Sequence, residues 1–134
     1  MQIIDLTDEQ VSTLENQLAE YDGTHMEVQP EGHISLGIMN EGQLIAGLDA
    51  CMTAYKILYV STVFVEAAFR RHGYGKTLMT ALEHRARALG ANMIRLDTFD
   101  WQGKAFYEAL GYEIVGSYEN RQDGFSEYFF LKRL

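Results

Sequence analysis

The sequence predicts an α/β fold built on a mixed β-sheet, and three observations lead to this prediction. Segments with alternating apolar residues are joined by short turn sequences, which is typical of antiparallel hairpins. A long apolar segment is followed by a helical pattern and then by another apolar segment, which is the pattern of a β-α-β crossover. The length of 134 residues is close to that of a typical domain, so we expect one domain over residues 1–134.

Each helix and strand is predicted by a local pattern. Thr7 is predicted to cap a helix because Gln10 follows three positions later, the spacing of a capping box, and Gly23 ends that helix. Asn40-Glu41-Gly42 is a turn between two alternating segments. The expected elements in chain order are a short strand at 2–5, a helix between 7 and 23, strands at 34–38, 43–51 and 57–65, a helix around 78–89, a strand at 92–98, a helix at 101–110, and strands at 112–118 and 125–131.

The segment from Ile57 to Val65 is predicted to be a central strand. β-branched and aromatic residues occupy both parities of its sequence, ILYVSTVFV, so we expect it to be buried on both faces. Apolar residues then recur at helical spacing from Leu78 to Leu89, and Gly90 stands where a helix-terminating glycine belongs. This strand and this helix therefore begin the predicted crossover.

The composition and charge exclude several classes of protein. The formal net charge is −8, from 19 acidic and 11 basic residues, whereas nucleic-acid-binding domains usually carry a basic face. The excess of acidic residues favours a cationic small molecule or a basic peptide as partner, or it serves only solubility. No apolar run approaches 18 residues, the N-terminus lacks a signal-peptide pattern, and Cys51 is the only cysteine. We therefore expect a cytoplasmic protein with no membrane contact and no internal disulfide.

Residues 64–76 carry the pattern that points most clearly to chemistry. They lie between a predicted strand and the start of a predicted helix, where free backbone N–H groups and the helix dipole favour an anion. Two glycines in the segment allow a ligand to approach the main chain closely. Arg70, Arg71 and Lys76 add positive charge in an otherwise acidic chain. Together these features predict a phosphate or pyrophosphate site.

Three phosphate-binding patterns compete for this segment. Gly75-Lys76-Thr77 resembles the end of a Walker A loop, but Arg70 stands where that loop requires a glycine. A dinucleotide-binding fingerprint requires a third glycine where this chain has Leu78. The pattern [Arg/Gln]-x-x-Gly-x-[Gly/Ala] is met by Arg70, Gly73 and Gly75, after a strand and before an amphipathic helix.

With this third pattern the sequence resembles the GCN5-related N-acetyltransferase (GNAT) family. Residues 105–112, AFYEALGY, are similar to a second element of that family, and the two elements occur in the expected order, separated by one helix and one strand. The resemblance spans residues 57–134. It implies a twisted, mostly antiparallel sheet of six to seven strands, splayed between the fourth and fifth strands and flanked by about three helices.

The resemblance also implies a reaction. Acetyl would pass directly from acetyl-coenzyme A (acetyl-CoA) to an amine in a ternary complex, with Tyr107 as the general acid that protonates the departing thiolate. Asp97, on the strand that flanks the splay, is the carboxylate we select as general base. The residues expected to bind acetyl-CoA are Phe64, Val65, Arg70, Arg71, His72, Gly73, Tyr74, Gly75, Lys76 and Asp100. We expect no metal, because the four histidines show no metal-ligand spacing.

The chain departs from the family's pattern at positions that bear on the mechanism. Asp100 stands where the family often has asparagine, and Tyr59 stands where many members carry a glutamate base. The general base therefore stays open between Asp97 and Glu66. Two other functions also stay open: a non-catalytic, acyl-CoA-binding regulatory module on the same scaffold, and a P-loop phosphotransferase. A homodimer formed through the apolar C-terminal residues 129–134 is a further possibility.

Overall fold

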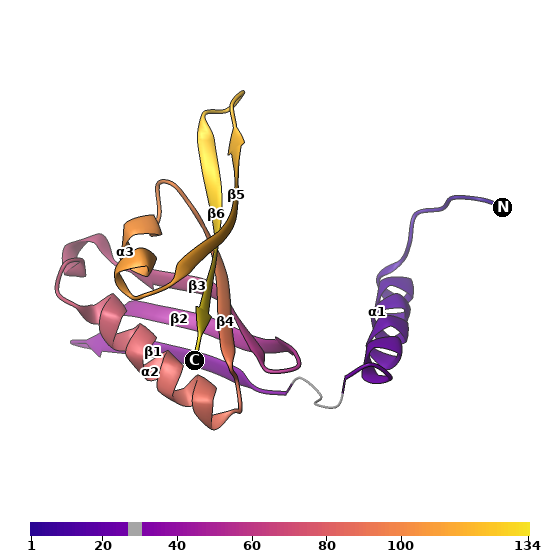
Figure 1. The fold of residues 1–134 in the computed structure, drawn as a ribbon, viewed down its shortest axis with the longest axis horizontal. Coiled ribbons are helices and arrows are strands. Elements are labelled where there is room, and N and C mark those ends of the chain that lie inside the picture. The colour runs from indigo at the N-terminus through magenta and orange to yellow at the C-terminus, as the bar shows by residue number, and fades with distance from the viewer. Residues whose placement is uncertain (27–30) are drawn as a thin grey trace.

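The computed structural model describes residues 1–26 and 31–134, which form two parts (Figure 1). We call residues 1–26 the arm and residues 31–134 the body. The arm holds α1 (Asp8–Gly23). The body holds, in chain order, β1 (His33–Asn40), β2 (Gln43–Ala54), β3 (Ile57–Val65), a 3₁₀ turn η1 (Ala67–Phe69), α2 (Tyr74–Ala88), β4 (Met93–Phe99), α3 (Lys104–Ala109), β5 (Glu113–Asn120) and β6 (Phe125–Arg133).

The strands of the body form one six-stranded sheet in the order β1-β2-β3-β4-β6-β5. Every neighbouring pair is antiparallel except β3 and β4, which are parallel. These two strands pair only over residues 57–59 and 93–95 and then separate. The separation begins where the register of β3 against β2 shifts between Val60 and Thr62, which leaves Ser61 as the extra residue of a β-bulge and bends the strand. The predicted mixed and splayed sheet is therefore confirmed.

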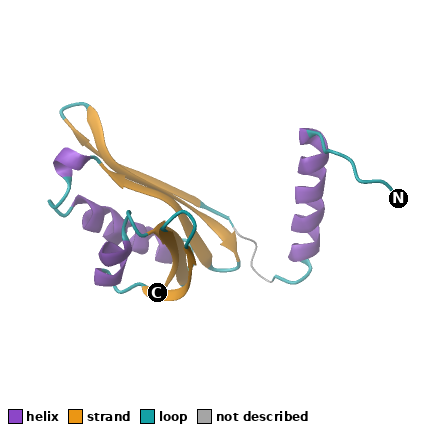
Figure 2. Ribbon diagram, turned by 90° about the horizontal axis from the view of Figure 1, so that it is seen from above, coloured by secondary structure: helices purple, strands orange, loops and turns teal. Residues whose placement is uncertain are grey.

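Helices α2 and α3 lie on the same side of the sheet (Figure 2) and close the hydrophobic core against it. Leu78, Leu82 and Ala86 of α2 are buried, which is the apolar stripe expected from their helical spacing. They belong to the same cluster as Leu58 of β3 and Ile94 of β4, both completely buried. The pairing of one apolar helix stripe with one apolar sheet face is therefore what holds the body together.

The opposite face of the sheet has no helix of the body on it (Figure 2), and we call it the open face. The residues of β4 alternate in burial, so that Arg95 and Asp97 are exposed on this side. Burial alternates along β3 only as far as Val60, and Phe64 near its end is 58 % exposed. The expectation that β3 is buried on both faces is therefore wrong. Its outer half is apolar because it lines a cavity and not because a second layer covers it.

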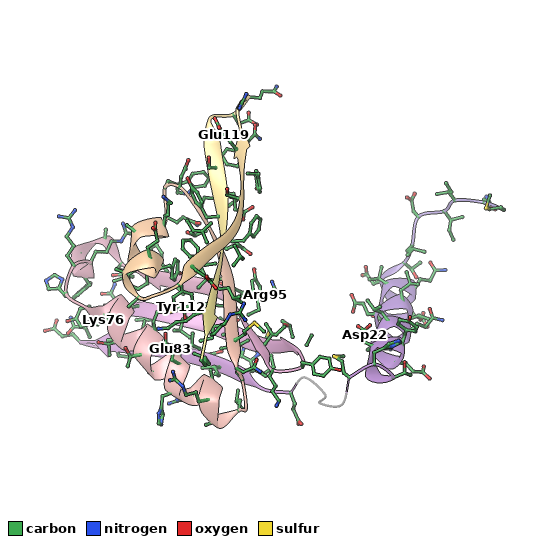
Figure 3. All side chains as sticks on the ribbon, viewed as in Figure 1. Asp22, Lys76, Glu83, Arg95, Tyr112 and Glu119 are labelled. Carbon is green, nitrogen blue, oxygen red and sulfur yellow. The ribbon has the colours of Figure 1, made fainter. Side chains whose placement is uncertain are left out.

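Strand β6 links the sheet to α2 through a mostly buried ion pair. The ammonium group of Lys132 donates hydrogen bonds to the carboxylate of Glu83 and to the carbonyl of Leu110, both at 2.8 Å. The two charged side chains are only 24 % and 16 % exposed. Figure 3 shows Glu83 and Tyr112 at this junction. The C-terminal hairpin is thereby fixed to the helix that begins at the cavity.

Helix α3 begins at Lys104, three residues later than predicted. The side-chain oxygen of Gln102 accepts the backbone N–H of Phe99 at 2.8 Å. The hydroxyl of Thr98 accepts the N–H of Gly103 at 3.1 Å. These side-chain bonds hold the intervening segment in a turn, so the helix starts only after it.

The arm is well formed locally but is not packed on the body (Figure 3). Thr7 and Gln10 make the complete capping box: the Thr7 hydroxyl accepts the N–H of Gln10 at 3.2 Å, and the Gln10 side chain accepts the N–H of Thr7 at 2.9 Å. No residue of α1 is buried. The predicted strand at Gln2–Asp5 is wrong: these residues are exposed and irregular, because no segment of the described chain lies beside them to supply a pairing partner.

Candidate functional site

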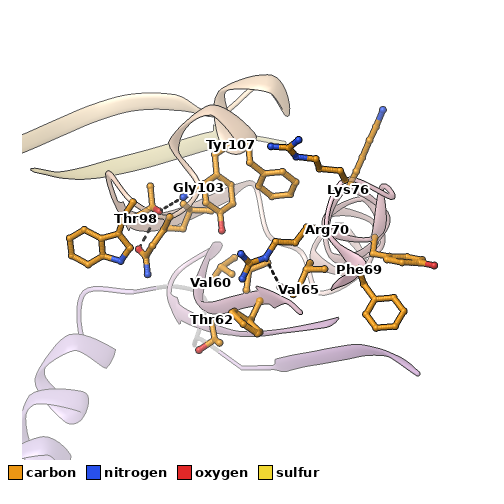
Figure 4. Close-up of a pocket in the computed structure, with 18 of the residues that line it drawn as sticks. Val60, Thr62, Val65, Phe69, Arg70, Lys76, Thr98, Gly103 and Tyr107 are labelled. Carbon is orange, nitrogen blue, oxygen red and sulfur yellow. Dashed lines mark hydrogen bonds between the residues drawn. The ribbon is translucent and has the colours of Figure 1, made fainter. Parts of the chain in front are cut away.

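A cavity of about 1110 Å³ opens where β3 and β4 separate (Figure 4). It is lined by the outer part of β3, the loop before α2, the first turn of α2, the end of β4 and the segment that leads into α3. Small-molecule sites commonly measure about 300–1,000 Å³. The cavity is therefore large enough for a ligand of cofactor size.

The loop before α2 presents a cradle of free backbone N–H groups to this cavity. Gly73 is the N-cap of α2 with φ 81°, and Arg71 has φ 64°, so both lie in the left-handed region. Within the described part of the chain, no backbone N–H from Arg71 to Lys76 donates a hydrogen bond. A Cβ atom placed on Gly73 would meet nothing within 4 Å. Free N–H groups at the N-terminus of a 15-residue helix, facing open space, are suited to bind an anion.

Three cationic side chains surround the cradle. Arg70, Arg71 and Lys76 all line the cavity, and in the described residues none of them pairs with a carboxylate. The Nε of Arg70 donates to the carbonyl of Val65 at 2.9 Å, and its guanidinium lies 5.4 Å from the centre of the Phe64 ring. Arg70 is therefore anchored at the outer end of β3. Its charge adds to the attraction that the cradle exerts on an anionic ligand.

Two glycines beside the cavity allow aromatic rings of α3 to pack closely against the backbone. A Cβ atom on Gly75 would lie 3.1 Å from the ring of Phe106, and one on Gly103 would lie 3.0 Å from the ring of Tyr107. Both distances are tighter than most Cβ contacts in proteins, so a side chain at either position would force the facing ring to move by a few tenths of an ångström. Gly75 therefore permits the close packing of α2 against α3, in addition to lining the cavity.

Tyr107 of α3 points its hydroxyl into the cavity (Figure 4). The residue is only 8 % exposed, because its ring packs among the rings of Phe106, Tyr112 and Phe130. Burial, with a smaller contribution from the negative charge of Asp97, raises the pKa of Tyr107 to about 12. The phenol is therefore a neutral O–H donor at every physiological pH.

On the open face, Asp97 of β4 and Tyr59 of β3 form a hydrogen-bonded pair at the mouth of the cavity. The hydroxyl of Tyr59 donates to the carboxylate of Asp97 at 3.1 Å. The guanidinium of Arg95 lies 4.3 Å from the centre of the Tyr59 ring. Partial burial and the hydrogen bond to Asp97 raise the pKa of Tyr59. Tyr59 stands where many family members have a glutamate. Its hydroxyl therefore positions a carboxylate, that of Asp97, which comes from the neighbouring strand β4.

Ten of the twelve predicted site residues line the cavity, and two do not. The ring of His72 lies on the surface, 6.0 Å from the ring of Tyr74. The carboxylate of Asp100 accepts the N–H of Ser126 at 2.9 Å and so joins the end of β4 to the start of β6. Roles for these two residues in cofactor binding stay predictions. Glu66, the other candidate base, also lies outside the lining, and its carboxylate accepts the side-chain amide of Gln43 at 3.2 Å.

The sequence leaves open whether Phe99, Trp101, Tyr55 and Tyr118 line an acceptor pocket or only pack in the core, and the structure brings Phe99 and Trp101 together at the β4 end of the cavity. Trp101 lines the cavity and is 64 % exposed. Its ring stacks on Phe99 with centroids 4.6 Å apart and an interplanar angle of 8°, and Phe125 meets it edge-on. In the sequence, the signal for this group is the run of aromatic residues at the end of a predicted strand. The orientation of Trp101 depends on the turn held by the side chains of Thr98 and Gln102, and hydrophobic periodicity does not predict such hydrogen bonds.

Two further properties concern membranes and metals. In residues 1–26 and 31–134, no helix is both long enough and apolar enough to cross a membrane. The same residues contain no group of three or more His, Cys, Asp or Glu side chains placed to hold a metal ion. The absence of a metal requirement stays a prediction.

Comparison with known proteins identifies the family to which this chain belongs. Residues 2–112 match the model of the Acetyltransferase (GNAT) family. A Blasticidin-S acetyltransferase from Streptomyces morookaense is 29 % identical over 111 residues, which are 81 % of this chain and 81 % of that protein. The crystal structure of an acetyltransferase from Bacillus cereus ATCC 14579 is 29 % identical, with a TM-score of 0.92 over 100 % of this chain and 98 % of the other.

The chain therefore belongs to the GNAT family and is an acetyltransferase. A Bacillus anthracis str. Ames protein solved in complex with acetyl-CoA shares the fold, with 18 % identity and a TM-score of 0.70 over 83 % of this chain and 67 % of the other. The range matched by the family model, residues 2–112, includes the cradle and Tyr107.

Proposed function

We propose that this protein transfers acetyl from acetyl-CoA to an amine on a cationic small molecule or a basic peptide, in a ternary complex and in the cytoplasm. The observation that carries the proposal is the cradle: backbone N–H groups without partners at the start of α2, three adjacent cations, and the cavity beside them. This arrangement suits a pyrophosphate joined to an elongated arm.

Acetyl-CoA binds with its pyrophosphate on the N–H groups from Arg71 to Lys76. Its pantetheine arm then runs beside the outer half of β3, which has lost its neighbour because β4 pairs with it only as far as Tyr59. The free strand edge at Phe64 and Val65 can hydrogen-bond an extended chain as a further strand would. This path leads the thioester toward Tyr107, whose hydroxyl faces the same cavity.

The chemical step is a direct displacement at the thioester carbonyl. The neutral amine nitrogen forms the new C–N bond, the C–S bond breaks, and Tyr107 gives its phenolic proton to the departing sulfur. The nitrogen then releases its extra proton through water, which restores the Tyr107 phenol. A phenol with a pKa of about 12 keeps this proton until the thiolate develops. Tyr107 is the group that we assign as general acid.

The acceptor enters from the side of Asp97. An amine with a pKa near 10 arrives as an ammonium and must lose a proton before it attacks. The carboxylate of Asp97, held by Tyr59, takes this proton through water and attracts the cation beforehand. The exposed face of Trp101 at the same cavity supplies a cation–π surface. The formal charge of −8 favours a cationic acceptor over a neutral one.

The proposal is tested by measuring thiol release from acetyl-CoA in the presence of a panel of amines. Polyamines, aminoglycosides, basic peptides and neutral amino acids form the panel, and we expect turnover with at least one cationic class. Binding of acetyl-CoA measured by calorimetry, with no turnover on any amine, would instead identify the regulatory module. Thermal protection by ATP and none by acetyl-CoA would overturn the assignment of the cradle.

Tyr107→Phe tests the general acid. We expect kcat to fall by roughly 10²-fold with little change in the Kd for acetyl-CoA, because the variant lacks only the proton donor. Tyr112→Phe is the matched control, since that buried ring lies 5.9 Å from the ring of Tyr107 but does not line the cavity. An equal loss in both variants would show that the effect is structural.

The pH profile gives an independent test of the same assignment. Because the pKa of Tyr107 is raised, its donor form persists up to about pH 12. We therefore expect kcat to rise as the acceptor amine loses its proton and to show no falling limb below pH 10.5. A falling limb between pH 8 and 10 that persists in Tyr107→Phe would show that another group is the required proton donor and would contradict the assignment.

A further inference from the structure

The arm exposes an apolar surface that the body does not cover. Its large apolar residues are 40–97 % exposed, apart from the chain-terminal Met1. On α1 they recur at positions three or four apart, so they form one continuous stripe. The members of this stripe and of the segment before it are Ile3, Ile4, Leu6, Val11, Leu14, Leu18 and Tyr21. Among the described residues, the body donates one side-chain hydrogen bond to the arm, from the Tyr55 hydroxyl to the carbonyl of His25 at the base of the arm.

A helix of this kind is not stable in isolation. Isolated helices shorter than about 12–15 residues are marginal in water even when they are rich in alanine. Helix α1 is only slightly longer, with 16 residues, and Ala19 is its one alanine. The capping box satisfies some of its first N–H groups but adds only a small stabilisation. The stripe therefore needs a second surface to keep α1 folded.

The position of the arm is shared with the related Bacillus cereus structure. The arm makes up 26 of the 134 residues, so a TM-score of 0.92 over the whole chain requires that the arm superposes together with the body. An arm folded back onto its own sheet in that crystal structure would lower the score well below this value. The extended position therefore belongs to both proteins, and the surface that covers the stripe lies on another molecule.

One end of the open face carries a basic cluster that complements the acidic arm, although Asp97 lies further along β4 on the same face. The arm carries six acidic residues and no lysine or arginine, whereas residues 27–134 have a net charge of only −2. Arg95, Arg133 and Lys56 are exposed at the end of the sheet where β3, β4 and β6 meet. In the described residues none of them pairs with a carboxylate. Half-buried Ile57 and Met93 lie beside them.

We infer that the arm docks on the open face of a second copy of this chain, and that the two copies exchange arms. The apolar stripe of α1 packs on Ile57 and Met93 of the partner. The acidic residues that border the stripe, Glu15 and Asp22, face the partner's basic cluster. Each copy offers one arm and one open face, so the exchange closes as a two-fold dimer and leaves neither surface free.

The experiment measures the mass of the full chain by light scattering and sedimentation over 1–100 μM. We expect twice the chain mass of 15.3 kDa. The double variant Leu14→Glu/Leu18→Glu places charge on the stripe and should weaken the dimer by at least 100-fold. Asn16→Glu adds one negative charge to the opposite side of α1 and should leave the dimer intact. A monomeric full chain, or a dimer that the double variant does not weaken, would overturn the inference.

Cross-linking separates exchanged arms from any other dimer. Cys51 is the only cysteine, so Gln17→Cys in a Cys51→Ser background carries one benzophenone label on the flank of the stripe. We expect illumination to give a covalent dimer. A label that couples only within its own chain would show that the arm folds back, and would also overturn the inference. None of these readouts uses acetyl transfer, so they stand or fall independently of the proposed function.

Discussion

Helices α1 and α2 are nearly equal in length, 16 and 15 residues, but they are stabilised in opposite ways. Helix α1 satisfies its first N–H groups with its own capping box and buries no side chain. Helix α2 begins at left-handed Gly73, has no side-chain cap and buries four residues. A helix that keeps its N-terminal N–H groups free for a ligand must gain its stability elsewhere, and α2 gains it from the core.

The largest expected contrast between the two helices is in stability. Leu82→Ala removes a completely buried side chain from α2 and should lower the free energy of unfolding by about 2–5 kcal/mol. Leu14→Ala removes the same atoms from α1, where the side chain is 54 % exposed, and should change the stability of the body by less than about 0.5 kcal/mol. Urea unfolding followed by the fluorescence of Trp101 measures both.

This measurement is made on dilute protein, so that contacts between copies contribute little. A loss of more than 1 kcal/mol in Leu14→Ala under these conditions would show that α1 packs on its own body. It would contradict the independence of the two helices and, with it, the exchange of arms.

The fold of the body was predictable because its elements are defined by local patterns. The stripe from Leu78 to Ala86 and the turn at Asn40-Glu41-Gly42 are visible in sequence, and the structure places a helix and a hairpin there. The position of the arm was not predictable in this way. The capping box at Thr7 defines where α1 starts, but no local pattern states which surface its stripe meets.

The site was predictable where its function depends on the main chain. A left-handed N-cap favours glycine, and the residues from Arg70 to Lys76 are contiguous, so one segment of sequence contains the whole cradle. The pair of Tyr59 and Asp97 was not predictable as a pair. These residues are 38 positions apart, and they meet only because β3 and β4 run parallel for a short distance before they separate.

The next contrast compares the two ends of α2. Gly73→Val places a β-branched residue at φ 81° in the cradle, and Gly90→Val places it at φ 88° just beyond the other end of the helix. Neither site has an atom within 4 Å of the new Cβ, so both variants should lose a similar 1–2 kcal/mol of stability from backbone strain, about the cost of the left-handed region.

Only Gly73→Val should also weaken binding of acetyl-CoA, by about tenfold, because its side chain covers the free N–H groups and shifts the loop that carries them. Titration calorimetry with acetyl-CoA measures this difference. Equal affinities in the two variants would place the pyrophosphate somewhere other than the cradle.

The smallest expected effect concerns the cap of α1. Thr7→Ala removes the hydroxyl that accepts the N–H of Gln10 and should destabilise this helix by about 1 kcal/mol, without changing the unfolding midpoint of the body. Ser12→Ala removes a hydroxyl from the helix interior and should leave α1 unchanged or slightly more stable, since alanine has the higher helix propensity. Hydrogen exchange of the α1 amides measures both variants. Faster exchange in Thr7→Ala that spread to α2 would show that the two helices unfold together, and the division of the chain into arm and body would then be wrong.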